Sequence, residues 1–347
     1  MKHIRLTKIG KIIFLCIALG TAGALGYFLL PIHSSSKETE PSPSPSASPS
    51  YIPSPTVSAS PTPSAASKQK ITSDLQTKIT AYLSENDIDT ENVGIYVHDF
   101  TTDAEYSLNA DTYFIAASTY KLPLALYYYE KINAGEYSLD DTVTFVSYGS
   151  SDEEEESGIH AWKTDATASP VPSAEPSAEP SASPEPSEEP SDSPTPEPVV
   201  YSETVGDLLH SMILYSDNTA AEGLYEHMGG WETFKIETSK YSDGTYSDDN
   251  TFTPSYMNDV LQYVYRHKDT LKTLLNDMLA SQPDDYLNQN IGDIMEQKYG
   301  DFGGALNAVG LSSQGRPYSI AVYTYGCDNG TQIIGDINEI CYTYLNQ

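Results

Sequence analysis

Ser118 and Lys121, in the run Ser118-Thr119-Tyr120-Lys121, are residue types that together can support covalent catalysis. A serine hydroxyl is a weak nucleophile unless an adjacent base takes its proton. On a helix, side chains three positions apart share a face, so we expect the lysine amine beside the hydroxyl. The pattern is common by chance, and alone it indicates only the solvated start of a helix.

A second run, Ser216-Asp217-Asn218, follows an apolar segment with helical periodicity. The hydroxyl of Ser216 can relay a proton, and the amide of Asn218 can hold the carbonyl group of a ligand. The same residue types are also common helix N-caps, a role open to Asp217 or Asn218. Taken alone, the run favours the capping interpretation.

The third run, Lys298-Tyr299-Gly300, ends a strand-like segment near the C-terminus. A glycine there would let a substrate approach the strand backbone closely. Lys298 would offer a positive charge to a substrate carboxylate. In isolation, the run indicates an edge-strand lysine followed by a turn.

In this order, the three runs resemble the Ser-x-x-Lys, Ser-Asp-Asn and Lys-(Thr/Ser)-Gly motifs of class A β-lactamases and penicillin-binding proteins. The resemblance covers about 71–164 and 199–347, and it is strongest around residues 114–126, 207–220 and 310–318. It implies a serine hydrolase that acts through an acyl-enzyme on a β-lactam or a peptidoglycan peptide. Such a reaction needs no metal and no cofactor.

The resemblance also implies a role for each matched residue. Ser118 is the nucleophile, and Lys121 accepts its proton, helped by burial and by the Lys298 cation, both of which should lower the Lys121 pKa. Ser216 returns the proton to the leaving nitrogen, and Asn218 holds the substrate amide. Lys298 is the fourth implied catalytic residue. The remaining implied substrate contacts are with Tyr299, Gly300 and Asp301, the last sharing the oxyanion hole through its backbone N–H with that of Ser118.

Two departures from the family pattern are clear. Tyr299 replaces the small hydroxyl residue of Lys-Thr-Gly, so its hydroxyl lies farther from the backbone. The Glu-x-x-Leu-Asn loop of the family's lactamases is absent between Trp231 and Phe252. Candidates for a substitute base are Glu232, Glu237, Asp243, Asp248 and Asp249, and none is assigned.

Three functions therefore remain open. The first is β-lactam hydrolysis, which should be slow because the loop that carries the deacylation base is missing. The second is a D-alanyl-D-alanine peptidase acting on peptidoglycan, which would use the same residues. The third is a non-hydrolytic module that binds penicillin or the cell wall. A purely structural surface domain would show no acylation at all.

The elements that must position these residues can be read from periodicity and turn signals. Helices are expected at 70–86, 118–133, 204–215, from Thr253-Pro254 onward, and at 331–345. Strands are expected at 93–100, 105–108, 293–299, 305–311 and 318–325. Because strands and helices do not alternate, we expect an α+β fold: an antiparallel five-stranded sheet flanked by helices, plus a helical lobe.

Residues 1–69, which precede the predicted helices and strands, differ from them in composition. Residues 12–30 carry no charge and follow a basic segment, so we expect residues 1–33 to hold a cytoplasmic N-terminus and a membrane anchor. A cleaved signal peptide is the alternative, with Ala22-Gly23-Ala24 as its cleavage site. Residues 34–69 should be a disordered linker, and a Pro/Ser/Glu-rich insertion at about 165–198 should interrupt the domain at 70–347. The catalytic domain would then lie outside a bacterial cell.

Composition limits the remaining possibilities. The 347 residues carry a formal charge of −31, which argues against a nucleic-acid partner because such a partner needs a basic face. Three cysteines are too few for a disulfide scaffold or a multi-cysteine zinc site. We expect Cys327 and Cys341 to be free thiols and the catalytic domain to be a monomer.

Overall fold

The computed structural model describes residues 64–147, 198–242 and 250–347. The expected membrane anchor, most of the expected linker and nearly all of the insertion lie outside the described residues. Within the described ranges, no helix is long and apolar enough to cross a membrane.

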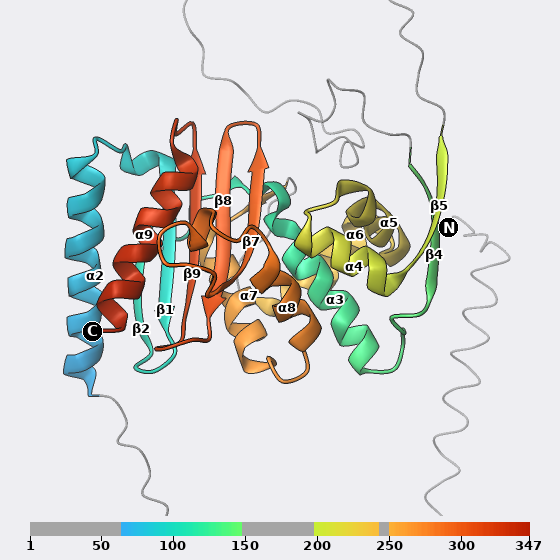
Figure 1. Ribbon diagram of the computed structural model, residues 1–347, viewed down its shortest axis with the longest axis horizontal. Helices are drawn as coiled ribbons and strands as arrows, with labels where there is room; N and C mark the ends of the chain where they lie inside the picture. The colour runs from blue at the N-terminus through green and yellow to red at the C-terminus, as the bar shows by residue number, and fades with distance from the viewer. Residues whose placement is uncertain (1–63, 148–197, 243–249) are drawn as a thin grey trace, which may run out of the picture. The chain divides into compact units, whose positions relative to one another are not determined.

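A five-stranded sheet lies between two groups of helices in the described chain (Figure 1). Its strands are β1 (Val93–Asp99), β2 (Ala104–Leu108), β7 (Met295–Phe302), β8 (Ala305–Ser312) and β9 (Tyr318–Tyr325), in the order β2-β1-β9-β8-β7. All neighbouring strands are antiparallel. The expected five-stranded antiparallel sheet is therefore confirmed, and β7, which carries the third motif, lies at one edge.

Two helices cover one face of this sheet, α2 (Ala65–Glu85) and α9 (Gly330–Leu345) (Figure 1). Helical spacing brings Ile71, Leu75, Ile79 and Leu83 of α2 into one buried row. This row packs in the same apolar cluster as Val97 and other strand residues. Helix α2 begins earlier than expected, so residues 65–69, assigned to the linker, are helical.

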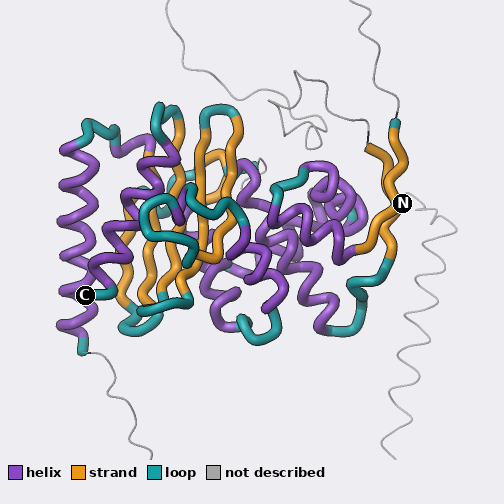
Figure 2. Tube along the Cα trace, viewed as in Figure 1, coloured by secondary structure: helices purple, strands orange, loops and turns teal. Residues whose placement is uncertain are grey.

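Buried residues on the other face share one apolar cluster with a second set of helices, which forms the expected helical lobe (Figure 2). They are α3 (Lys121–Asn133), α4 (Val205–Leu214), α5 (Asn218–Met228), α6 (Gly230–Thr238), α7 (Pro254–Arg266) and α8 (Lys272–Ala280). Strand alternation divides the sheet between the two cores: Ala308 faces the cluster of α2 and α9, whereas Val309 faces the lobe.

Threonine side chains cap the starts of two predicted helices. Thr253 caps α7 by accepting a hydrogen bond from the Tyr256 N–H at 3.1 Å, and Pro254 occupies its first turn. Thr204 caps α4 in the same way, accepting from the Asp207 N–H at 3.1 Å.

Two short sheets were not expected from the sequence. One pairs β3 (Phe114–Ile115) with β6 (Thr251–Phe252), and the other pairs β4 (Thr142–Ser147) with β5 (Val199–Thr204). Strands β4 and β5 precede and follow the insertion. The residues on its two sides are therefore held together by antiparallel strand pairing. Both cysteines of the described chain, Cys327 and Cys341, are free thiols.

The helix expected at 118–133 is divided. Residues Ala117–Tyr120 form a 3₁₀ turn, and α3 begins only at Lys121. Pro123 is tolerated because it lies in the first turn of α3, where backbone N–H groups have no intrahelical partner. This division matters for the site because it places Ser118 in the turn and Lys121 at the head of the helix.

Candidate active site

The turn that carries Ser118 has a constrained backbone. Ala117 adopts a φ of +47°, a left-handed conformation that is rare for a residue other than glycine. Thr119 braces the turn by donating its hydroxyl to the Ala116 carbonyl at 2.7 Å. Such strain persists only where surrounding contacts hold it, and it is common at reactive residues.

Asparagines from two distant elements hold the same turn. Asn307, in the middle of β8, donates its amide to the carbonyls of Ile115 and Ala116, at 2.7 and 3.2 Å. The Asn250 amide donates to the Ala117 carbonyl at 3.4 Å. Both asparagines are buried, so the bonds replace water as the partner of these carbonyls. Sequence reasoning missed both residues, although a polar Asn307 within an apolar strand was a usable signal.

Gly300 lets β7 lie directly against the nucleophile turn. A side-chain Cβ at this position would come within 2.8 Å of the Ser118 nitrogen and 3.0 Å of the Ala116 oxygen. No residue other than glycine fits without displacing backbone. The glycine therefore serves the contact between strand and turn, whereas the sequence suggested a role in substrate approach.

Lys121 is fully buried, and its amine is directed at the second motif. The Nζ donates to the Ser216 carbonyl and to Asn218 Oδ1, both at 2.6 Å, and lies 3.3 Å from Ser216 Oγ. No hydrogen bond joins Lys121 to Ser118 Oγ, which has no hydrogen-bond partner within the described chain. The motif residues are brought together. Lys121 contacts the second motif, however, whereas we expected its amine to lie beside the hydroxyl of Ser118.

Lys298 approaches the same hydroxyl from β7. Its Nζ donates to Ser216 Oγ at 2.9 Å and to its neighbouring carbonyl, that of Tyr299, at 2.8 Å. Ser216 Oγ therefore lies between two lysine amines that come from α3 and β7. Three segments distant in sequence, one from each motif, meet at this hydroxyl.

Burial dominates the electrostatics of the two lysines. It lowers the pKa of Lys121 to about 7, against a smaller opposing effect of the Asp217 carboxylate. Burial also lowers the pKa of Lys298 well below its usual range, and the nearby charge of Lys121 lowers it further. Burial therefore lowers the pKa of Lys121 as expected from the sequence, whereas between the two lysines it is the charge of Lys121 that lowers the pKa of Lys298.

The residues of the second motif have different structural roles. Asp217 is the N-cap of α5, accepting a hydrogen bond from the Ala220 N–H at 2.9 Å. Asn218, the first residue of α5, is thereby free to bind Lys121. Ser216 itself has a φ of +57°, so this loop also holds a left-handed residue beside the reactive groups.

The carboxylates considered as water-activating bases have other partners or lie outside the described residues. Glu232 pairs with Lys235 within α6, and Glu237 of α6 pairs with Lys240 in the 3₁₀ turn that follows it, both at 3.2 Å. Asp243, Asp248 and Asp249 are not among the described residues. A carboxylate that the sequence reasoning did not consider, Glu222, lies half-buried one turn after Asn218, and its charge adds to the burial that raises the pKa of Tyr120.

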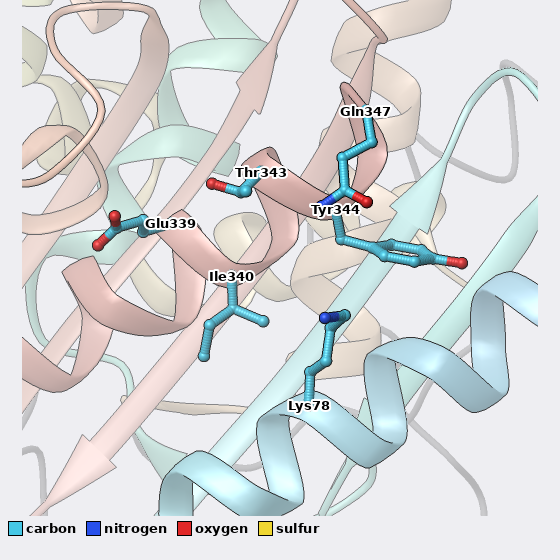
Figure 3. A pocket seen from close by; sticks show the side chains of 6 residues that line it. All are labelled: Lys78, Glu339, Ile340, Thr343, Tyr344 and Gln347. Carbon is cyan, nitrogen blue, oxygen red and sulfur yellow. The ribbon is translucent and has the colours of Figure 1, made fainter.

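Other features of the surface do not take part in this arrangement. A hollow of about 260 Å³ between α2 and α9 is lined by residues away from all three motifs, with Lys78 of α2 facing Tyr344 of α9 (Figure 3). Its lining is Lys78, Glu339, Ile340, Thr343, Tyr344 and Gln347. Among the described residues, no group of three or more His, Cys, Asp or Glu side chains could hold a metal ion.

The sheet flanked by helices gives this chain the fold expected of a β-lactamase-like serine hydrolase. The serine on a strained turn and the two buried lysines around a second serine are the groups that such an enzyme uses. Residues 74–345 match the profile of the Beta-lactamase enzyme family. The chain belongs to this family, whose class A members the motifs resemble. No curated protein sequence matches the chain.

Solved structures agree on the fold. The TLA-3 extended-spectrum β-lactamase has a TM-score of 0.57 at 20% identity, over 80% of this chain and 100% of that one. A mutant of PBP-A, solved as an acyl-enzyme complex with penicillin G, has a TM-score of 0.55 at 17% identity, over 78% of this chain and 96% of that one. A β-lactamase from Sphaerobacter thermophilus has a TM-score of 0.54 at 19% identity, over 79% of this chain and 97% of that one.

Proposed function

We propose that the protein is a membrane-anchored, extracellular serine acyl hydrolase that forms an acyl-enzyme with β-lactams through Ser118 and releases the product slowly. The observation that carries the proposal is Lys121: a buried amine, with a pKa of about 7, one helical turn from a serine on a strained turn. A lysine that is substantially neutral near neutral pH can act as a general base.

The proposed acylation step begins with transfer of the Ser118 Oγ proton to the neutral amine of Lys121. The Oγ then bonds to the lactam carbonyl carbon, and the carbonyl oxygen becomes an oxyanion. Backbone N–H groups of Ser118 and Asp301 would stabilise that charge, and the contact of Gly300 with the Ser118 nitrogen supports this pairing.

Collapse of the tetrahedral intermediate breaks the carbon–nitrogen bond. The leaving nitrogen takes a proton from Ser216 Oγ, which is replenished from Lys121, so the proton first removed from Ser118 reaches the product. The position of this hydroxyl between two amines, 2.9 Å from Lys298 and 3.3 Å from Lys121, supports the relay. Asn218, whose side-chain oxygen binds Lys121, would hold the substrate amide through its NH₂ group.

The test is covalent labelling of the full-length chain with a fluorescent penicillin, followed by peptide mass spectrometry. We expect one label per chain, at Ser118. The Ser118→Ala variant should lose the label while its melting temperature stays within about 2 °C, because only one half-exposed hydroxyl is removed. Labelling that persists in this variant would refute the assigned nucleophile.

Two other functions use the same acylation step. A D-alanyl-D-alanine peptidase would transfer or hydrolyse a peptidoglycan peptide, and a binding module would keep the acyl group without hydrolysing it. The ion pairs of Glu232 and Glu237 favour slow hydrolysis of an acyl-enzyme formed with a β-lactam, which is compatible with both alternatives. Hydrolysis of a D-alanyl-D-alanine peptide faster than of any β-lactam would favour the peptidase.

The location is proposed from the sequence of residues 1–33, in which a basic segment precedes an uncharged run. The enzyme domain would then face the outside of a bacterial cell, where peptidoglycan and β-lactams occur. Fractionation of cells that express the full-length chain tests this. Recovery of the intact chain in the soluble fraction would contradict membrane anchoring.

A further inference from the structure

The side chain of Tyr299 extends from β7 to the loop of the second motif. Its hydroxyl donates to the Tyr215 carbonyl at 3.5 Å, and Tyr215 directly precedes Ser216. The centre of its ring lies 5.0 Å from that of Tyr286 and 4.0 Å from Lys298 Nζ. The ring is thus held on three sides, and it covers the place where strand and loop meet beside Lys298.

With Tyr299 in this position, the amine of Lys298 is not available to a carboxylate of a substrate. Lys298 has no exposed surface, and its amine is already bonded to Ser216 Oγ and to the Tyr299 carbonyl. In the motif that the chain resembles, a short hydroxyl side chain follows the lysine and leaves room beside it. Here a phenol ring fills that room, and its own hydroxyl is turned to a backbone carbonyl.

The charges around the ring are also unfavourable to an anion. Asp301 follows on the same face of β7, and Asp285 precedes Tyr286; after burial, these two carboxylates are the next causes of the raised pKa of Tyr286. The arginines of the described chain are placed elsewhere. Arg316 pairs with Asp99, and Arg266 ends α7 beside Tyr263. A substrate carboxylate would therefore meet two acids and a shielded lysine.

We infer that Tyr299 determines specificity by closing the subsite beside Lys298 to carboxylates, so that the preferred acyl donors carry an uncharged group there. Esters and amides of the carboxyl group, rather than free acids, are the matching substrate class. The inference rests on the proposed function, because it concerns compounds that acylate Ser118. It assigns Tyr299 to substrate selection and not to bond making.

The experiment compares benzylpenicillin with its methyl ester on the full-length chain. These compounds share the lactam ring and the acyl side chain and differ in one negative charge. The second-order rate constant of acylation is measured for each by intact-protein mass spectrometry. We expect the ester to acylate the protein at least as fast as the acid, and faster acylation by the acid would overturn the inference.

The Tyr299→Thr variant restores a short hydroxyl and uncovers Lys298. We expect the acid-to-ester ratio of rate constants to rise about tenfold to a hundredfold, the usual effect of one hydrogen bond to a charged group. The ratio should stay at its starting value in Tyr299→Phe, which keeps the ring, and in Tyr325→Thr, at an exposed position that ends β9. An unchanged ratio in Tyr299→Thr would overturn the inference.

The two failures are distinguishable. If neither compound acylates the wild-type chain, the proposed function fails and the inference fails with it. If both acylate Ser118 but the acid is preferred, only the inference fails. Circular dichroism and melting curves of the variants show whether a lost reaction reflects an unfolded protein.

Discussion

Lys121 is the residue at which burial is converted most directly into chemistry. An ordinary lysine is protonated below a pH of about 10, so it has no lone pair to accept a proton at neutral pH. Enclosure at the head of α3 lowers the pKa of Lys121 to about 7, so that neutral and charged forms are both populated near neutral pH. The two 2.6 Å bonds to Ser216 and Asn218 fix the amine in place in either form.

A pH dependence follows from the direction of this shift. The base must be neutral, so the acylation rate should rise with pH and level off above about 7. At one pH unit below the pKa only about a tenth of the lysine is neutral, so the rate should fall to about a tenth of its plateau. Labelling rates measured from pH 5.5 to 9.5 test this, with constant ionic strength.

Two variants sharpen the pH experiment. Lys121→Arg, which stays charged, should lower the acylation rate by about 10²–10⁴ and remove the inflection. Lys78→Met removes a lysine of α2 that faces the hollow beside α9, and it should keep the wild-type profile (Figure 3). An inflection near the pH of an ordinary lysine would contradict a neutral Lys121 base.

At the scale of elements, the site depends on how closely β7 packs against the turn at 117–120. Only Gly300 permits this approach, because a Cβ would lie 2.8 Å from the backbone nitrogen of Ser118. Backbone atoms cannot swing aside as a flexible side chain can. A change at Gly300 therefore moves the strand or the turn, and with it the pair of N–H groups proposed for the oxyanion hole.

Gly300→Ala should lower the acylation rate by about 10²–10³, which is the usual cost of losing one oxyanion donor. Gly135→Ala is the matched control. Gly135 follows α3 with a φ of +75° and has open space around its Cα, so alanine there costs about 1 kcal/mol of stability without touching the site. Equal acylation rates in the two variants, measured by penicillin labelling, would show that the contact has no catalytic role.

Sequence patterns predicted most of these elements because their signals are local. The Thr253-Pro254 pair marks the start of α7, and strand-like runs separated by glycine-bearing turns mark β7, β8 and β9. The 3₁₀ turn at Ser118 was not predicted, because it is held by Asn307 and Asn250, which are distant in sequence. The bonds of Lys121 to the second motif also depend on tertiary packing, so the sequence identified the partners but not their geometry.

The segment that follows α5 bears on turnover. The interval from Trp231 to Phe252, which lacks the Glu-x-x-Leu-Asn string of the family's lactamases, begins within α6, where Glu232 and Glu237 are each paired with a lysine three residues on. General-base assistance to the attacking water is worth about 10²–10⁴ in rate. Without it, hydrolysis of the acyl-enzyme should lag behind acylation by a comparable factor.

A chromogenic cephalosporin should therefore give a burst of about one product per enzyme, followed by a slow steady state, in a stopped-flow measurement. Rapid, linear turnover without a burst would reject this expectation. Substitution of Asp243, Asp248 or Asp249 by Asn, and of Glu222 by Gln, would then locate the base. Intact mass spectrometry provides the control, because slow hydrolysis requires the acyl-enzyme to accumulate.

At the scale of the whole molecule, the chain combines a packed domain with segments of very different composition. Of its 23 prolines, eighteen lie in 41–63 and 170–198. The second of these tracts interrupts the sequence of the catalytic domain between the first and second motifs. The domain nevertheless has a continuous fold across this point, because β4 and β5 pair over their whole length, from Thr142 with Thr204 to Ser147 with Val199.

The hairpin is itself part of the core of the lobe. Phe145 of β4 is buried against α5, where a Cβ on Gly223 would lie 2.4 Å from the Phe145 ring. The pairing of Ser147 with Val199 holds the two ends of the interruption next to each other. Closing this gap therefore needs only a short connection, and the closure entropy depends weakly on its length, at about 0.6 kcal/mol for each doubling.

Replacement of residues 166–197 by a short Gly/Ser loop should leave the melting temperature within about 3 °C and the rate of penicillin labelling unchanged. The replaced tract has few apolar side chains, so it cannot bury enough apolar surface to offset the cost of ordering its backbone, which is about 1–2 kcal/mol per residue. Its removal should therefore change the stability of the domain little. Phe145→Ala, made in the full-length chain, provides the contrast, because a large side chain removed from the core typically costs about 3–5 kcal/mol. If the loop replacement lowers the melting temperature as much as Phe145→Ala does, the insertion must contribute contacts to the domain. The prediction that this tract is a disordered insertion would then be wrong.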